Sequence, residues 1–195
     1  MTLLADHEIQ ALSESGLITP FTPELVRHEH GRKILSYGLS SYGYDLRLSA
    51  KEFFTFRRIP SLLTDPKNFD PCTLARAPLF FDEDGSSYFV IPAHSYGLGV
   101  ALEHLAIPED ITAIFIGKSS YARCGLIANL TPGEAGWRGH LTLEFSNSSG
   151  ADCKIYANEG VVQALFYRGQ PCNTSYQHRT GKYQNQPHSV VHACV

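Results

Sequence analysis

Short blocks of apolar residues, many of them rich in Val, Ile, Tyr and Phe, recur along the chain between clusters of Gly, Pro, Asn and Asp. Such blocks favour β-strands, and the clusters between them favour turns. We expect strands near 43–48, 51–57, 87–91, 95–103, 111–116, 140–146, 153–157 and 161–167. Many short strands separated by turns are typical of a β-sandwich, a jelly roll or a barrel.

Two segments break the strand pattern and predict short helices. Residues 6–15 suit a helix with Asp6 as its N-cap and Gly16 as its C-terminal stop. Ser119 or Ser120 is expected to cap one or two helical turns that Gly125 ends.

The remaining segments predict loops and a polar tail within one domain. Residues 58–86 are rich in Pro, Asp and Gly, which indicates long loops. No internal repeat or long linker divides the chain, so we expect a single domain over residues 1–195. Residues 173–195 are polar and weakly patterned, and we expect them to form an arm that orders when a ligand binds.

Composition narrows the classes of function. The chain has 195 residues, of which 43% are hydrophobic, and a formal net charge of −3, so we expect no general affinity for nucleic acid. No apolar run reaches the roughly 18 residues of a membrane span, and the N-terminus does not resemble a secretion signal. The five cysteines are an odd, scattered set, which favours reduced thiols and a cytoplasmic protein.

The stretch Gly117-Lys118-Ser119 matches the end of a phosphate-binding P-loop. The full motif needs a glycine five residues before Gly117, where this chain has Thr112 inside an apolar strand. We therefore predict no P-loop. A strand followed by a glycine turn and a short helix still points backbone N–H groups outward, so an anion site is expected at residues 117–120.

Other catalytic motifs are incomplete. Zinc-dependent nucleobase deaminases carry Pro-Cys-x-x-Cys, and neither Pro71-Cys72 nor Pro171-Cys172 has the second cysteine. His28 and His30 would share one face of a strand, but no second pair of ligands lies nearby. Composition alone does not exclude a Ser-His-Asp catalytic triad, although the sequence has no Gly-x-Ser-x-Gly elbow to hold its serine.

One expected strand, 140–146, carries a carboxylate at its centre. Alternation predicts a core face made of Leu141, Leu143 and Phe145. It predicts an opposite face made of His140, Thr142, Glu144 and Ser146. Glu is disfavoured inside strands, and the neighbours of Glu144 offer it no ion partner. A solvated surface carboxylate and a functional one are both compatible with this pattern.

Several segments together closely resemble the dCTP deaminase family of the dUTPase-like superfamily. They are GKSSYARCGL (117–126), GWRGHLTLEFSN (136–147), KIYANEGVVQALFY (154–167), SSYGYDLRL (40–48), YFVIPAHSYGLGVALEHLAIPEDI (88–111) and GKYQNQ (181–186). The resemblance runs in order from about residue 6 to residue 190. It implies a mainly β fold, a dUTPase-like distorted β-barrel or jelly roll (β-clip) with a few short helices. It also implies homotrimers with active sites between subunits.

The resemblance further implies zinc-independent hydrolysis of dCTP to dUTP and ammonia, which feeds dUMP and dTTP synthesis. Mg²⁺ would bind with the triphosphate, and dTTP is the expected inhibitor. In the family pattern Glu144 matches the general base, and Ser119 and Arg123 match its two partners at the reacting centre. The other matches are expected to bind substrate: Lys118, Ser120, Gln163, Tyr176, Lys182, Gln186, Trp137 and Thr131. Asp45 lies in the first family motif.

The hairpin ANLTPGEAGWRGH (128–140) bears on whether the protein also has dUTPase activity. It is shorter than in dUTPases and lacks their Ile-Asp pair, and Glu134 is its nearest carboxylate. Pro132 also stiffens it. This form resembles the short-loop monofunctional dCTP deaminases. A deaminase that also releases pyrophosphate, a plain dUTPase, and a non-catalytic nucleotide-binding regulator of the same fold stay open as alternatives.

Overall fold

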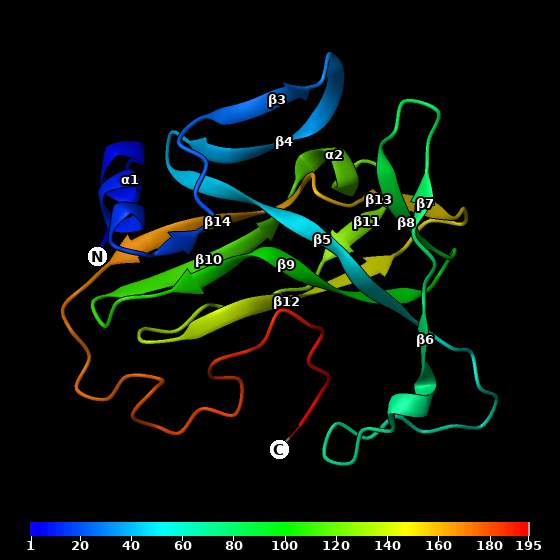
Figure 1. The fold of residues 1–195 in the computed structure, drawn as a ribbon. Coiled ribbons are helices and arrows are strands. Elements are labelled where there is room, and N and C mark those ends of the chain that lie inside the picture. The colour runs from blue at the N-terminus through cyan, green and yellow to red at the C-terminus, as the bar shows by residue number, and fades with distance from the viewer. Residues whose placement is uncertain (195) are drawn as a thin grey trace.

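Antiparallel strands pair into one large, curled sheet (Figure 1). The structure, a computed structural model, describes residues 1–194. The main path of the large sheet has the order β1-β14-β5-β9-β12-β11. These strands are β1 (Thr2–Leu3), β14 (Gly160–Arg168), β5 (Gly43–Phe56), β9 (Tyr96–Ala106), β12 (Arg138–Asn147) and β11 (Leu126–Ala128).

Further strands extend this sheet or form a second one. β10 (Ile111–Gly117) pairs with β14, and β2 (Ile18–Thr19) pairs with β9. The hairpin of β3 (Leu25–Glu29) and β4 (Arg32–Ser40) lies beside β5, which also pairs with β6 (Leu74–Arg76). The second sheet has the order β13-β8-β7, made of Cys153–Tyr156, Ser87–Ile91 and Phe80–Phe81.

The strand predictions are confirmed in position, but the short strands β1, β2 and β11 were not predicted, and other parts of the fold also differ. The expected strands 43–48 and 51–57 form one long strand, β5, whose register shifts between Leu48 and Phe53. The loop region 58–86 contains a 3₁₀ turn (Pro71–Thr73), β6 and β7. The β3–β4 hairpin was not predicted, because its half-exposed strands mix charged and apolar residues without a clean alternation.

Helix α1 (Asp6–Glu14) ends as its sequence predicts but begins one residue earlier than expected. The N-cap is Ala5, whose N–H donates to the Glu8 carboxylate at 3.1 Å, and Asp6 is the first helical residue. Gly16 follows the helix with a φ of 98°. The N–H of Leu17 returns to the Leu12 carbonyl at 3.0 Å, which closes a glycine-dependent C-terminal motif.

Helix α2 (Ser119–Ala122) is a single turn at the end of β10. Its N-cap is Lys118, and neither Ser119 nor Ser120 caps it as predicted, because Lys118 already has the extended backbone of a cap. The predicted stop is confirmed. Gly125 adopts a φ of 81°, and its N–H donates to the Ala122 carbonyl at 3.1 Å.

The core fills the curve of the sheet with aromatic and branched side chains. Phe53 stacks on Phe89 and Phe145, with ring centroids 5.2 and 6.4 Å away, and all three side chains are buried. This packing anchors β12, the strand that carries Glu144, against β5 and β8. Among the described residues, no helix is long and apolar enough to cross a membrane.

The C-terminal arm follows β14 and returns along β12 (Figure 1, orange to red). Gly139 and Gln186 form an isolated parallel bridge between β12 and the arm. The His140 N–H donates to the Gln186 carbonyl at 3.0 Å, and the Asn185 N–H donates to the Arg138 carbonyl at 2.9 Å. The arm is therefore docked by backbone hydrogen bonds, and its ordering by a nucleotide stays a prediction.

Candidate active site

A cleft of about 690 Å³ lies between β12, the hairpin that precedes it and the C-terminal arm. It brings together Glu144 and the expected substrate-binding residues Thr131, Trp137, Tyr176, Lys182 and Gln186. The apolar and aromatic walls of the cleft are not predicted by the sequence. These include Phe56, Phe69, Tyr96, Leu98, Leu130, Tyr183, Val191 and His192.

Glu144 is half-buried in this cleft and has no partner among residues 1–194. No hydrogen bond or ion pair reaches its carboxylate, and burial alone raises its pKa. A carboxyl group with a raised pKa can both accept and return a proton near neutral pH, as a general acid–base catalyst requires.

The predicted core face of β12 is only partly correct. Leu143 and Phe145 are buried in the core, but Leu141 is half-exposed and lines the cleft beside Thr142 and Glu144. The pairing of β12 with β9 shifts register between His140 and Thr142. A bulge of this kind interrupts the alternation of faces, so Leu141 turns toward the cleft.

The neighbours of Glu144 come from β9 and from the end of β11. Tyr96 lines the same cleft as Glu144, and burial, followed by the charge of Glu144, raises the pKa of its phenol. The Asn129 N–H donates to the Glu144 carbonyl at 2.8 Å. The Asn129 side chain donates to the Ser146 hydroxyl at 2.7 Å, which fixes the segment that leads into the hairpin.

The arm closes one side of the cleft through a chain of contacts. The Trp137 indole N–H donates to the Tyr183 carbonyl at 2.7 Å, and the Tyr183 N–H donates to the Tyr176 hydroxyl at 3.1 Å. The Gln186 side-chain carbonyl accepts from the N–H and the hydroxyl of Thr142, at 3.2 and 3.3 Å. Lys182 is exposed and lies with its ammonium 5.4 Å from the Tyr183 ring centroid. Gln186 thus contacts β12 at Thr142, two residues before Glu144.

The other predicted residues lie outside this cleft, around the end of β10. Ser119, Ser120 and Arg123 are exposed, and the Arg123 guanidinium donates to the Ser119 carbonyl at 3.2 Å. Ser120 lines a second cavity of about 410 Å³ together with Tyr121, Cys124 and Cys153. The chain therefore presents Glu144 and the Ser119–Arg123 pair on separate surfaces.

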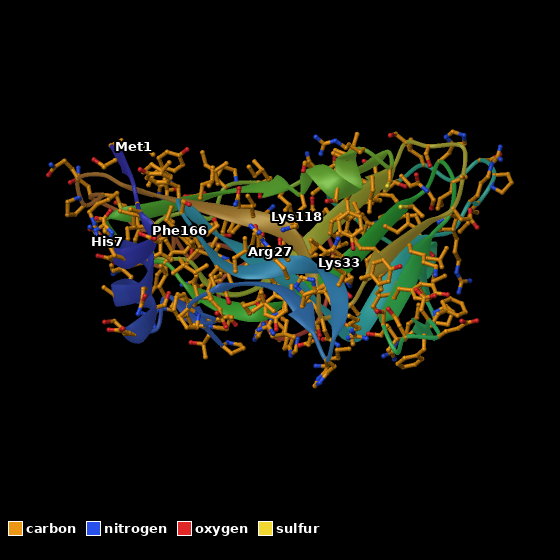
Figure 2. The ribbon with its side chains drawn as sticks, turned by 90° about the horizontal axis from the view of Figure 1, so that it is seen from above. Met1, His7, Arg27, Lys33, Lys118 and Phe166 are labelled. Atoms are coloured by element: carbon orange, nitrogen blue, oxygen red, sulfur yellow. The ribbon has the colours of Figure 1, made fainter. Side chains whose placement is uncertain are left out.

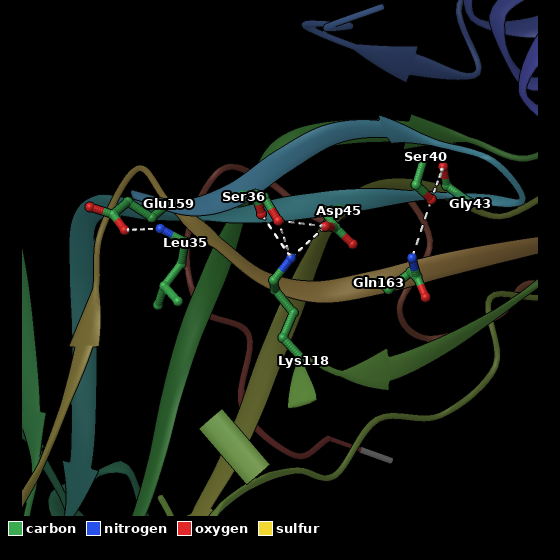
Figure 3. Close-up of polar contacts among 8 residues, drawn as sticks. All are labelled: Leu35, Ser36, Ser40, Gly43, Asp45, Lys118, Glu159 and Gln163. Carbon is green, nitrogen blue, oxygen red and sulfur yellow. Dashed lines mark hydrogen bonds and ion pairs between the residues drawn. The ribbon is translucent and has the colours of Figure 1, made fainter. Parts of the chain in front are cut away.

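Lys118 points inward from this turn rather than outward to solvent (Figure 3). Its ammonium pairs with the Asp45 carboxylate and donates to the carbonyl and hydroxyl of Ser36 at 2.9 and 3.0 Å. Seen from above, Lys118 lies near the middle of the molecule, while Met1 and His7 lie at one end (Figure 2).

Gln163 lies opposite Asp45 in the pairing of β14 with β5. Its side-chain amide donates to the Ser40 hydroxyl at 3.2 Å, beside the Lys118 contacts (Figure 3). Within residues 1–194, no group of three or more His, Cys, Asp or Glu side chains could hold a metal ion. Zinc-free chemistry stays a prediction.

These features define a class of protein: a mainly β fold with a half-buried carboxylate in an aromatic cleft. Such a site suits proton transfer to a flat ligand. The family model described as dCTP deaminase-like matches residues 3–169. The chain belongs to this family, which confirms the resemblance and the mainly β fold expected from it.

Relatives and a solved structure agree with this assignment. The dCTP deaminase of Dechloromonas aromatica is 48% identical over 188 residues, 95% of this chain and 96% of that protein. The dCTP deaminase of Paraburkholderia xenovorans is 49% identical over 194 residues, 98% of each chain. A crystal structure of 2′-deoxycytidine 5′-triphosphate deaminase from Agrobacterium tumefaciens has a similar fold. Its TM-score is 0.58 and its identity 19%, over 86% of this chain and 46% of that longer one.

Proposed function

We propose that this protein hydrolyses the 4-amino group of dCTP and releases dUTP and ammonia. The observation that carries the proposal is the unpartnered carboxylate of Glu144 in an aromatic cleft. The full-length similarity to proteins named dCTP deaminase supports this choice of substrate. A planar pyrimidine suits the aromatic walls, since such rings stack on flat apolar surfaces.

Glu144 would move protons in two stages. It takes a proton from water as the water oxygen bonds to C4, and it delivers that proton to N3. The second proton of the water, now on the C4 hydroxyl, then passes through Glu144 to the amino group. The C4–N bond breaks, ammonia leaves, and C4 keeps the oxygen as the carbonyl of dUTP. All atoms of dCTP and water are accounted for without a redox step.

Ser119 and Arg123 would act on the Glu144 of a neighbouring copy. Both are exposed and lie outside the cleft of their own chain, and this supports a homotrimer with active sites between subunits. An Arg123 guanidinium arriving near Glu144 would stabilise the ionised carboxylate and lower its pKa, against the effect of burial. Ser119 would hydrogen-bond the attacking water.

The triphosphate would extend toward the arm and the turn at residues 117–120. Lys182 is exposed at the rim of the cleft, and Ser119 and Ser120 are exposed at the start of α2. Mg²⁺ would arrive with the nucleotide and neutralise part of its charge, since Mg²⁺ commonly binds substrate phosphates rather than an all-protein cage. We also propose that dTTP inhibits the deamination and that the protein is cytoplasmic.

A second activity would release dUMP and pyrophosphate. Glu134 also lines the cleft, but its carboxylate forms an ion pair with the Arg179 guanidinium at 3.7 Å. The short hairpin and this pairing favour deamination alone. A non-catalytic regulator would bind dCTP without releasing ammonia.

Incubation with dCTP and Mg²⁺, followed by chromatography and an ammonia assay, separates these functions. Deamination gives equal amounts of dUTP and ammonia. Accumulation of dUMP and pyrophosphate would point to the second activity, and unchanged dCTP would point to the regulator. Deleting residues 173–195 tests the arm: unchanged affinity for dCTP would remove it from the site.

A further inference from the structure

A serine, a histidine and a carboxylate come together where the C-terminal arm begins. The Ser175 hydroxyl donates to the Glu109 carboxylate at 3.0 Å and lies 2.9 Å from the Nδ1 atom of His178. The same Nδ1 atom is 3.6 Å from the Glu109 carboxylate. Composition alone does not exclude a catalytic group of this kind, and the fold assembles this one outside the cleft that contains Glu144.

The arrangement of these three side chains does not suit nucleophilic attack. In a catalytic triad the serine and the acid contact opposite nitrogens of the histidine ring. Here Ser175 and Glu109 both approach Nδ1 of His178, and only 2% of Ser175 is exposed. A hydroxyl that is buried and shared in this way can hold two segments together, but it cannot reach a substrate.

Ser175 is held on two sides by segments that are distant in the sequence. Glu109 lies in the turn between β9 and β10, and a hydrogen bond to a carboxylate is stronger than one between neutral groups. On the other side lies the hairpin before β12. The Tyr176 N–H donates to the Ala135 carbonyl at 2.8 Å, and a Cβ atom at Gly136 would come within 2.8 Å of the Ser175 Cβ atom. The missing side chain at Gly136 thus leaves the space that Ser175 fills.

Residues 175–182 then turn back toward the cleft. The Arg179 N–H donates to the Ser175 carbonyl at 3.0 Å, and the Gly181 N–H donates to the Tyr176 carbonyl at 3.2 Å. A Cβ atom at Gly181 would come within 2.1 Å of the Tyr176 ring, so glycine lets the turn close on that ring. Tyr176 and Lys182 both line the cleft. The direction in which they enter it follows from the position of Ser175.

We infer that Ser175 is a positioning residue, which Glu109 anchors so that the turn at residues 175–182 presents Tyr176 and Lys182 to the substrate. Without this anchor, the turn would have to be ordered each time dCTP binds, and the entropy cost would weaken binding. The triphosphate is remote from the reacting C4 atom, so the loss falls on binding rather than on the chemical step. The effect on dCTP rests on the proposed function, whereas the anchoring of the turn does not.

Steady-state kinetics with dCTP test the role in binding. Ser175→Ala and Glu109→Ala should each raise KM about tenfold and change kcat by less than about twofold. The double variant should resemble the more affected single variant, because both changes remove the same interaction. Glu109→Gln keeps an oxygen that accepts the Ser175 hydrogen bond, so its KM should stay within about threefold of the wild-type value.

Ser189→Ala is the matched control, because it removes a hydroxyl from the same arm. The Ser189 side chain makes no hydrogen bond within residues 1–194. Its KM and kcat should equal those of the wild-type protein. A rise in KM as large as that of Ser175→Ala would overturn the inference. So would a fall in kcat with unchanged KM in both Ser175→Ala and Glu109→Ala.

Hydrogen exchange at the amides of residues 176–184 tests the anchor without any turnover. Exchange there should become faster in Ser175→Ala and Glu109→Ala and should keep its wild-type rate in Ser189→Ala. Exchange in β12 should stay slow in all three variants, which shows that the fold is intact. Unchanged exchange of residues 176–184 in both anchor variants would overturn the inference. Absence of ammonia release from the wild-type protein would instead refute the proposed function, and exchange alone would then decide on the anchor.

Discussion

Gly139 of β12 and Gln186 of the C-terminal arm lie in direct backbone contact, and this contact holds the arm over the cleft that contains Glu144. Gly139 has a φ of 141°, and a Cβ atom there would come within 2.5 Å of the Gln186 nitrogen. Only glycine satisfies both conditions at this position. The strand that carries the catalytic candidate is thus also the docking strand of the arm.

Gly139→Ala is expected to detach the arm, because the added methyl group collides with backbone and strains the local φ. Affinity for dCTP should fall about tenfold or more, a loss of about 1.4 kcal/mol. Protease cleavage within residues 173–194 should become faster. Gly169→Ala is the control, since nothing lies within 4 Å of a Cβ there. Equal cleavage rates for the two variants would refute the docking role of Gly139.

Arm docking is expected to weaken as the pH falls below about 6.5, the ordinary pKa of histidine. The His188 ring stacks on His140 with centroids 4.4 Å apart. Burial lowers the pKa of His188, and His140 and Lys51 lower it further, while the Glu52 carboxylate acts in the opposite direction. The detached arm therefore binds protons more readily, so docking is strong above this pH and is lost as the pH falls.

Hydrogen exchange of residues 183–194 between pH 8 and pH 5.5 measures this effect, after correction for the intrinsic pH dependence of exchange. His188→Phe keeps an aromatic ring against His140 but cannot be protonated, and it should flatten the profile. The same profile in both proteins would show that His188 does not sense pH.

The buried Arg47–Glu103 pair is expected to contribute to stability rather than to chemistry. The Arg47 guanidinium donates to Glu103 at 2.6 Å, and the Glu103 side chain has 0% exposure. Glu103→Gln should lower the free energy of unfolding by about 3 kcal/mol, because it leaves Arg47 without its counter-charge. Urea unfolding of Glu134→Gln is the comparison. Its partner Arg179 is exposed, so that loss should stay below about 1 kcal/mol. Equal losses would contradict this difference.

The sequence predicts the features that depend on neighbouring residues. Apolar runs located the main strands, Gly16 and Gly125 ended their helices as expected, and the central position of Glu144 in a strand marked it as unusual. These signals arise within a few residues of each other, where alternation and capping act.

The features that sequence reasoning missed depend on contacts between distant segments. Lys118 and Asp45 are 73 residues apart, so nothing local indicates that the lysine turns inward. Phe69 from the long loop and His192 from the arm stack with centroids 5.4 Å apart at the edge of the cleft. Neither residue stands out in its own segment, and only the fold brings them together.

The most direct test of the proposed function is the reaction of dCTP with the wild-type protein and with Glu144→Gln, followed by measurement of both dUTP and ammonia. The wild-type protein should form the two products in equal amounts. Glu144→Gln should be at least about 10²-fold slower, because an amide cannot relay the proton. Glu134→Gln, the same change at the other carboxylate of the cleft, should keep deaminating. Near wild-type ammonia release by Glu144→Gln, or dUMP and pyrophosphate without dUTP from the wild-type protein, would contradict the proposed function.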